Sequence, residues 1–169
     1  MTGLGVDDIR NHVIRTPSDP DITYDDDPLR ILRCVRFASR FGWEISAETY
    51  SGMIRNVSRL SIITSERIRE ELFKMLTGPR PVMAMDLLRN TGAMHYVIPE
   101  FDASFDMTQN EYHSGTVWEH TLAVLGGVAG SDLEICLAAL LHDIGKTVTR
   151  TESEGKVHFI EHEAAGARI

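Results

Sequence analysis

The chain has 169 residues, enough for one ordinary domain or two small ones. Hydrophobic residues make up 43% of it, so a core can be buried, yet no run approaches the roughly 20 apolar residues of a membrane span. The formal net charge of −8 argues against simple binding to polyanions, although a local basic face can act within an acidic protein.

The beginning of the chain has no basic end followed by an apolar stretch, so it contains no visible secretory signal. Cys34 and Cys136 both fall in apolar helical surroundings, which favours buried free thiols over a disulfide. We therefore expect a cytoplasmic protein without a membrane partner.

The segment up to residue 27 is predicted to be extended or loop structure. "NHVIRT" has short strand character, and "PSDPDITYDDD" is typical of a turn-rich, acidic linker. Helical patterns begin directly after it. In "DPLRILRCVRFASRFG", Asp27 can cap a helix, Pro28 suits its first position and Gly42 suits its exit.

Three further helices are predicted in the first half. Ser46 can cap one that extends to about Asn56, and Ser65 can cap "ERIREELFKML". Another is expected from Pro81 to Asn90. Each has apolar residues at three-and-four spacing, the pattern of a helix with one buried side.

A looser polar stretch, "EFDASFDMTQNEYHSG", is predicted to separate two helical parts. Beyond it we expect helices over Val117–Val128 and Leu133–Leu141, a hairpin or loop in "TRTESEGKVHF", and a last helix from about Glu161, within which the chain stops. The predicted fold class is mostly all-α. Its expected parts are a small non-helical N-terminal remnant (1–27), a helical region (28–100) and part of a second helical domain (101–169).

Most of the seven histidines lie in the second half of the chain. Three of them, together with Asp143, form a candidate set of metal ligands. His120 falls inside a predicted helix, His142-Asp143 ends another, and His162 opens the last. Imidazole and carboxylate ligands suit a divalent ion: zinc, manganese, iron, nickel or magnesium. Gly145 would let the backbone turn so that the adjacent His142 and Asp143 face one ion.

The alternative is that these residues are polar surface groups or hydrogen-bonded core histidines. A polar pair directly after Leu140 and Leu141 needs a partner if it is buried, and a cation is a suitable one. We favour the metal site.

"HTLAV", "LLHDIGK" and "HEAAGARI" resemble the HD superfamily of metal-dependent phosphohydrolases. The resemblance implies that His120 is the first ligand, His142-Asp143 the dyad and His162 an auxiliary ligand. Lys146 follows the dyad and is implied to meet a substrate phosphate. The final aspartate ligand of that family is expected beyond the last helix of this chain.

The first helix has four arginines, Arg30, Arg33, Arg36 and Arg40, whose spacing places them on one face. Neighbouring guanidinium groups repel one another unless an anion or carboxylates lie between them. Because the arginine fork matches phosphate, the pattern favours a nucleotide or nucleic-acid site. The alternative is a solvated basic face that balances the acidic "YDDD".

The stretch "IRTPSDPDITYDDDPLRILRCVRFASRFGWEIS", followed by "SERIREELFKML", resembles the neck of bacterial class II tRNA nucleotidyltransferases of the poly(A) polymerase family. "QNEYHSGTVWEHTL" resembles the junction at which many of these enzymes enter an HD domain. The resemblance implies that Asp27 and Arg30 read the Watson–Crick edge of incoming CTP or ATP, and that Arg33 and Arg36 also bind nucleotide. It implies tRNA as a partner and magnesium as a cofactor of the whole enzyme.

The catalytic head of that family carries a Gly-Ser motif and an Asp-x-Asp pair. No Gly-Ser pair precedes residue 28, and Asp7 and Asp8 are adjacent rather than spaced. We therefore expect a middle piece of a longer enzyme that adds CCA, or only A or C, to tRNA 3′ ends, with this piece silent by itself. The competing hypothesis is a free-standing HD phosphohydrolase of nucleotides or cyclic phosphates.

Overall fold

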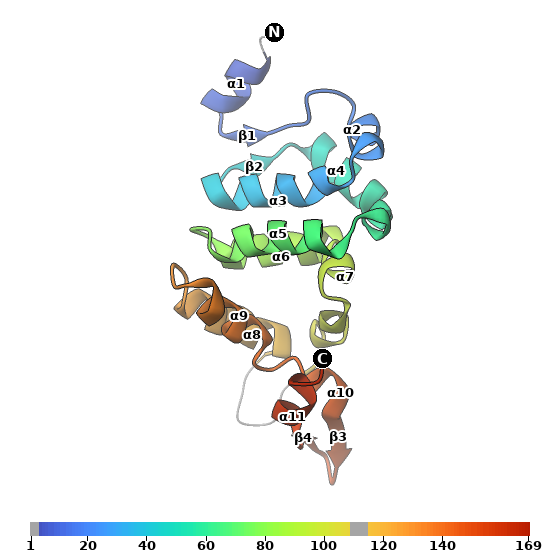
Figure 1. Ribbon diagram of the computed structural model, residues 1–169, viewed down its shortest axis with the longest axis vertical. Coiled ribbons are helices and arrows are strands. Elements are labelled where there is room, and N and C mark those ends of the chain that lie inside the picture. The colour runs from blue at the N-terminus through green and yellow to red at the C-terminus, as the bar shows by residue number, and fades with distance from the viewer. Residues whose placement is uncertain (1–3, 109–114) are drawn as a thin grey trace. The chain divides into compact units, whose positions relative to one another are not determined.

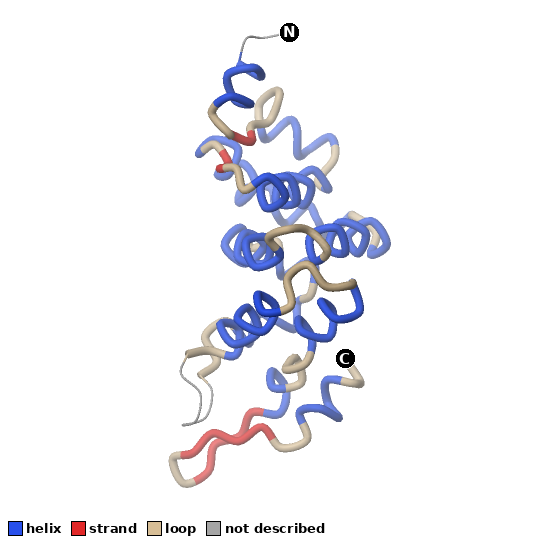
Figure 2. The backbone as a smooth tube through the Cα atoms, turned by 90° about the vertical axis from the view of Figure 1, so that its left-hand side faces the viewer, coloured by secondary structure: helices blue, strands red, loops and turns tan. Residues whose placement is uncertain are grey.

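A computed structural model describes residues 4–108 and 115–169 of the chain, and its chain path divides into two compact units, Met1–Val97 and Ile98–Ile169. Helices dominate the described residues, as Figure 2 shows, and the strands form two short pairs. The predicted mostly all-α fold is thus confirmed. The expected junction "QNEYHSG" falls largely on residues 109–114, which lie outside the described residues.

The first unit is built around α3 (Leu29–Phe41), which contacts both α5 and α6 (Figure 1). One side of α3 supplies Ile31, Leu32, Val35 and Ala38, all fully buried, because these positions recur at three-and-four spacing. Gly42 ends the helix with φ 69°, a left-handed conformation that glycine adopts at little cost. The remaining elements of this unit are α1 (Leu4–Arg10), β1 (Val13–Ile14), α2 (Pro20–Asp26), β2 (Glu44–Ile45), α4 (Ala47–Asn56), a 3₁₀ turn (Val57–Ile62), α5 (Ser65–Leu76), α6 (Pro81–Thr91) and α7 (Met94–Val97).

The prediction that residues 1–27 form a non-helical remnant is wrong, because α1 and α2 are helices. Asp19 caps α2 by accepting a hydrogen bond from the Asp21 backbone N–H, and Pro20 takes the first helical position. The Pro and Asp residues that suggested a turn therefore begin a helix. Packing against α4 then buries one side of it, where Gly52 leaves room for the Pro20 ring.

Most predicted helix boundaries in this unit agree with the structure. Ser46 caps α4 through its hydroxyl, which accepts from the Thr49 N–H at 3.3 Å. Ser65, expected to cap α5, is instead its first residue, and Thr64 occupies the capping position. The difference is one position and leaves the buried face of α5 unchanged.

The second unit contains a helical pair, α8 (Val117–Gly127) and α9 (Leu133–Leu141), that contact each other. A hairpin follows, in which β3 (Arg150–Ser153) and β4 (Lys156–Phe159) pair in antiparallel register (Figure 2). Two short helices flank the hairpin, α10 (Lys146–Thr149) and α11 (His162–Gly166). A 3₁₀ turn (Pro99–Ser104) opens the unit.

Candidate functional site

The second unit brings the end of α9 against α8 and α11. A capping box between Thr116 and Glu119 fixes the beginning of α8, and the fully buried Trp118 anchors it, so that His120 is held in place one turn further on. The apolar α9 ends at His142 and Asp143. Asp143 is 4% exposed, which makes it the buried carboxylate of the group.

The other three predicted metal ligands, all histidines, converge around this carboxylate. The Nε2 atoms of His120 and His142 lie 3.2 Å apart, and they lie 3.5 and 3.2 Å from Asp143 Oδ2. His162 Nε2 approaches the other carboxylate oxygen, Oδ1, at 3.5 Å. One ligand atom from each of His120, His142 and Asp143 lies within 4.8 Å of the other two, a spacing that one ion can span.

Backbone carbonyls orient two of the imidazole rings. His142 Nδ1 donates to the Ala139 carbonyl at 2.9 Å, and His162 Nδ1 donates to the Phe159 carbonyl at 2.9 Å. The carbonyl contact keeps a proton on Nδ1, so Nε2 is the atom that a metal ion could bind once it displaces the Nε2 proton, and in both rings Nε2 is the atom turned towards Asp143. This is the arrangement of a metal-binding histidine with its outer partner.

The charges around Asp143 favour its ionised form. Burial alone opposes ionisation, but hydrogen bonds from His142 and Lys146 outweigh it and hold the pKa of the Asp143 carboxyl well below its usual range. The hydrogen bond to Asp143 also raises the pKa of His142. Lys146 Nζ lies 2.7 Å from Asp143 Oδ2. A buried anion facing several imidazole nitrogens fits a divalent cation.

Glycines allow the third histidine to reach this group. A Cβ on Gly145 would lie 1.9 Å from the His162 carbonyl oxygen and 2.5 Å from the Gly166 nitrogen. The backbone after the dyad therefore lies directly against α11. The expectation that Gly145 permits a turn identified the right residue, but its role is this close approach rather than a positive φ.

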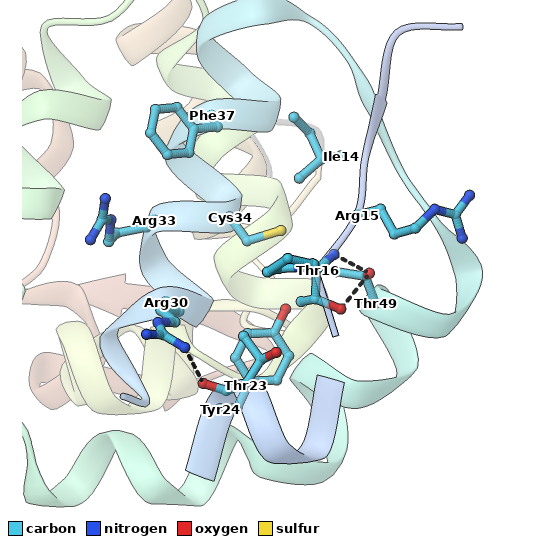
Figure 3. A pocket seen from close by; sticks show the side chains of 11 residues that line it. Ile14, Arg15, Thr16, Thr23, Tyr24, Arg30, Arg33, Cys34, Phe37 and Thr49 are labelled. Atoms are coloured by element: carbon cyan, nitrogen blue, oxygen red, sulfur yellow. Dashed lines mark hydrogen bonds between the residues drawn. The ribbon is translucent and has the colours of Figure 1, made fainter. Parts of the chain in front are cut away.

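The first unit contains a pocket of about 380 Å³ beside α3, lined by residues of α2, α3 and α4 and by residues 14–17 (Figure 3). Two of the predicted nucleotide-binding residues, Arg30 and Arg33, line it. Arg30 Nη1 donates to the Thr23 carbonyl at 3.2 Å, which holds the guanidinium beside the pocket. Burial raises the pKa of the Cys34 thiol in the wall to about 12, so that thiol stays neutral.

The other two predicted residues do not line this pocket. Asp27 accepts from the Leu29 N–H at 3.3 Å and from Arg67 Nη2 at 3.2 Å, so one carboxylate both caps α3 and binds α5. Arg36 forms an ion pair with Glu71, and only 15% and 7% of the two side chains are exposed. Carboxylates therefore lie beside two of the arginines: Glu71 of α5 binds Arg36, and Asp26 of "YDDD" approaches Arg30 at 3.9 Å.

Sequence reasoning missed Arg67 and Glu71 as partners of the candidate site. Both lie on α5, four positions apart and therefore on one face, and this face is turned towards α3. The spacing of opposite charges in "SERIREEL" was a signal, but it does not reveal the partner helix.

No helix among the described residues is long and apolar enough to cross a membrane.

Two family models match consecutive regions of the chain. Residues 42–105 match the probable RNA and SrmB-binding site of polymerase A, and residues 111–169 match the HD domain. The matched regions place a sequence similar to the RNA-binding region of polymerase A before one similar to an HD domain. Relatives that are similar across both regions belong to the class of CCA-adding enzymes and tRNA nucleotidyltransferases.

Within that class, the similar proteins are CCA-adding enzymes. A multifunctional CCA protein of Ectopseudomonas mendocina is 35% identical over 98% of this chain, and the chain spans 41% of the length of that relative. The crystal structure of the Bacillus stearothermophilus CCA-adding enzyme in complex with CTP shares 31% identity and a TM-score of 0.55, over 59% of this chain and 26% of that one. A tRNA nucleotidyltransferase complexed with a primer tRNA and an incoming ATP analog shares 25% identity and a TM-score of 0.59, over 76% and 34%.

Proposed function

We propose that this chain is the nucleotide-selecting and tRNA-binding part of a tRNA nucleotidyltransferase that adds CCA, or part of it, to tRNA 3′ ends. The observation that carries the proposal is the placement of Arg30 and Arg33 at one pocket beside α3 (Figure 3). Solved relatives described as complexes with CTP, or with tRNA and an ATP analog, support the same partners here.

In this proposal Arg30, which lines the pocket, and Asp27, three positions earlier and outside the pocket lining, recognise the base. A guanidinium donates and a carboxylate accepts, and the Watson–Crick edge of cytosine or adenine offers both acceptors and donors. Arg67 holds the Asp27 carboxylate, and the Thr23 carbonyl holds Arg30, so both groups are oriented before nucleotide binds. Arg33 binds a phosphate group of the nucleotide, and Arg36 stabilises the packing of α3 on α5 through its ion pair with Glu71.

The test is the ratio in which the full-length parent incorporates CTP, ATP and the wrong nucleotides. Arg30→Ala is expected to reduce discrimination by one bidentate contact, about 1–3 kcal/mol or roughly five- to 150-fold. Arg33→Ala is expected to weaken all nucleotides evenly, because phosphate contacts carry no base information. Arg55→Ala is the matched control, since it removes an exposed arginine that pairs with Asp21. Unchanged ratios for Arg30→Ala would remove the base-reading role.

The chain alone is expected not to add nucleotides to tRNA. Nucleotidyl transfer needs carboxylates that hold two metal ions. The spaced pair Asp19 and Asp21 does not supply them, because Asp19 caps α2 and Asp21 binds Arg55 and Asn56. Incubation with truncated tRNA, CTP, ATP and magnesium checks this, and robust incorporation would contradict it.

A second candidate function is metal-dependent phosphohydrolysis, favoured by the convergence of His120, His142, Asp143 and His162. These residues would hold the ion, which lowers the pKa of a bound water and polarises a phosphoryl oxygen when present. Lys146 would contact the substrate phosphate. Nickel, manganese, iron, zinc and magnesium are all compatible with the donor set. Release of phosphate from nucleotides or cyclic phosphates, lost in His142→Ala, is the test.

A further inference from the structure

The exposed side of α3 continues beyond the arginine pocket as a row of aromatic rings. Phe37 and Phe41 stack with ring centroids 6.1 Å apart and planes inclined by 8°. Phe41 then meets Trp43 at 5.1 Å, and Trp43 stacks on His12 at 5.2 Å. We call these four residues, together with Arg33 and Arg40, the aromatic–arginine face.

The backbone holds this row in place. Gly42, with φ 69°, turns the chain at the end of α3 so that Trp43 folds back beside Phe41. The Glu44 N–H donates to the His12 carbonyl at 3.1 Å, directly beside the pairing of β1 with β2. His12 itself has φ 57°, a left-handed conformation that is uncommon for a residue with a Cβ. Such a conformation persists only where surrounding contacts favour it, and the stacking of the His12 ring on Trp43 is one such contact.

The face is accessible although its residues are large and apolar. Phe41 is 48% exposed and His12 is exposed as well, whereas Phe37 and Trp43 are half-buried. Exposed aromatic rings gathered in one place mark a binding surface more often than rings scattered singly. At the other end of the row, the Arg36 guanidinium lies 4.2 Å from the centroid of Phe37, so a cation already uses one ring face.

The charges on the face indicate what covers it. Arg33 and Arg40 lie on the same side of α3 as the rings, and neither has a carboxylate ion-pair partner among the described residues. A chain with a net charge of −8 therefore places two uncompensated cations beside stacked aromatic rings. Phosphates complement the cations and flat bases complement the rings, which is the composition of a surface for unpaired nucleic acid.

The face also borders the arginine pocket. Phe37 lines that pocket together with Arg30 and Arg33 (Figure 3), so the row of rings leads away from it along α3. We propose that the aromatic–arginine face binds the unpaired end of an RNA strand by stacking a base on the exposed Phe41 ring, next to Trp43, while Arg33 and Arg40 contact phosphates. This inference deepens the proposed RNA-binding function, on which it rests, by naming the surface and the mode of contact.

The intrinsic fluorescence of the chain tests the proposal. It has two tryptophans, and Trp118 is fully buried in the second unit, so quenching by added RNA reports on Trp43. A short single-stranded oligoadenylate is expected to quench this fluorescence. An abasic strand of the same length carries the same phosphates and is expected to bind more weakly and to leave the fluorescence unchanged.

Variants separate stacking from charge. Phe41→Ala is expected to weaken oligoadenylate binding about tenfold, as loss of one stacking ring does. Phe41→Leu, which keeps an apolar side chain, is expected to lose nearly as much. Ile54→Ala is the matched control, since Ile54 is 46% exposed on α4, and it should bind like the unaltered chain. Arg40→Ala should reduce the dependence of binding on salt by about one phosphate contact.

The outcomes distinguish this inference from the proposed function. If oligoadenylate and the abasic strand bind equally, and Phe41→Leu binds like the unaltered chain, then RNA binds elsewhere and stacking is overturned while RNA binding stands. If no strand binds under low salt, both the face and the RNA-binding role of this chain are overturned. A thermal melt of each variant verifies that it is folded.

Discussion

The two candidate sites are built in different ways. In the first unit, the charged residues lie along one face of a single helix, and partners from neighbouring elements take up several of them: Glu71 binds Arg36, and Arg67 binds Asp27. In the second unit, the groups come from three elements and meet at one buried carboxylate, Asp143. A helix face can bind an extended ligand such as a nucleotide or a strand, whereas a convergent group suits one small ion.

The difference also concerns what stabilises each arrangement without ligand. Two arginines of α3, Arg30 and Arg36, are held by protein partners, so this part of the helix face is formed without ligand. Around Asp143, the Nε2 atoms of three imidazole rings approach one carboxylate, and Nδ1 of His142 and of His162 is bound to a backbone carbonyl. We therefore expect that removing a bound metal ion would destabilise the second unit more than removing a nucleotide would destabilise the first.

The largest expected effect is on that group. His142→Ala removes the imidazole that lies nearest to both His120 and Asp143, so calorimetry with nickel or manganese should show no remaining binding. His158→Ala, on the exposed side of β4, is the control and should bind normally. Equal metal binding by both variants would show that the convergent histidines are not ligands and would remove the contrast between the two sites.

The second largest effect is expected for the ion pair between Arg36 of α3 and Glu71 of α5. Glu71→Ala leaves the Arg36 guanidinium buried without its carboxylate, and about 3 kcal/mol of unfolding free energy should be lost. The exposed neighbour Glu70, which only approaches Lys74 at 3.8 Å, is the control. Urea titration measures both.

A double variant sharpens the result. Arg36→Met with Glu71→Leu should recover most of the lost stability, because two matched apolar side chains avoid burying charge. A full recovery with unchanged nucleotide selection in the parent would show that Arg36 has a purely structural role. Failure of Glu71→Ala to destabilise would contradict the ion pair as a support of α3.

A smaller effect is expected from Gly145→Ala. The added Cβ would collide with the His162 carbonyl, so α11 must move, at a cost of about 1–3 kcal/mol. Metal affinity should fall in parallel as His162 withdraws from Asp143. Gly127→Ala is the control, because no heavy atom lies within 4 Å of its added Cβ. Unchanged thermal stability and metal affinity in Gly145→Ala would show that the contact with α11 is unimportant.

Local signals predicted the helices well where capping and buried periodicity agreed, as in α4 with Ser46 and α3 with Gly42. They failed for α2. Its sequence contains Pro and several Asp residues, and it is helical because Asp19 caps it and α4 covers Thr23 and Tyr24. That second reason lies about 30 residues away along the chain, beyond the reach of local pattern.

For both candidate sites the sequence predicted which residues take part, but not which partners they contact. Spacing alone placed Arg30, Arg33 and Arg36 on one face, but only the fold reveals that Arg36 is occupied by Glu71 while Arg30 and Arg33 line a pocket. The candidate metal ligands followed from the motifs and the chemistry of imidazole and carboxylate. Their carbonyl partners could not be predicted, because every residue has a carbonyl and its direction depends on the fold.

Asp27 lies where three helices meet. It ends α2, its carboxylate binds the first turn of α3, and the same carboxylate binds Arg67 of α5. A shift of α5 against α3 therefore turns the carboxylate to a new direction. Under the proposed function, the choice between cytosine and adenine depends on how α3 and α5 pack against each other, so substitutions that change this packing are expected to alter nucleotide preference without touching the nucleotide.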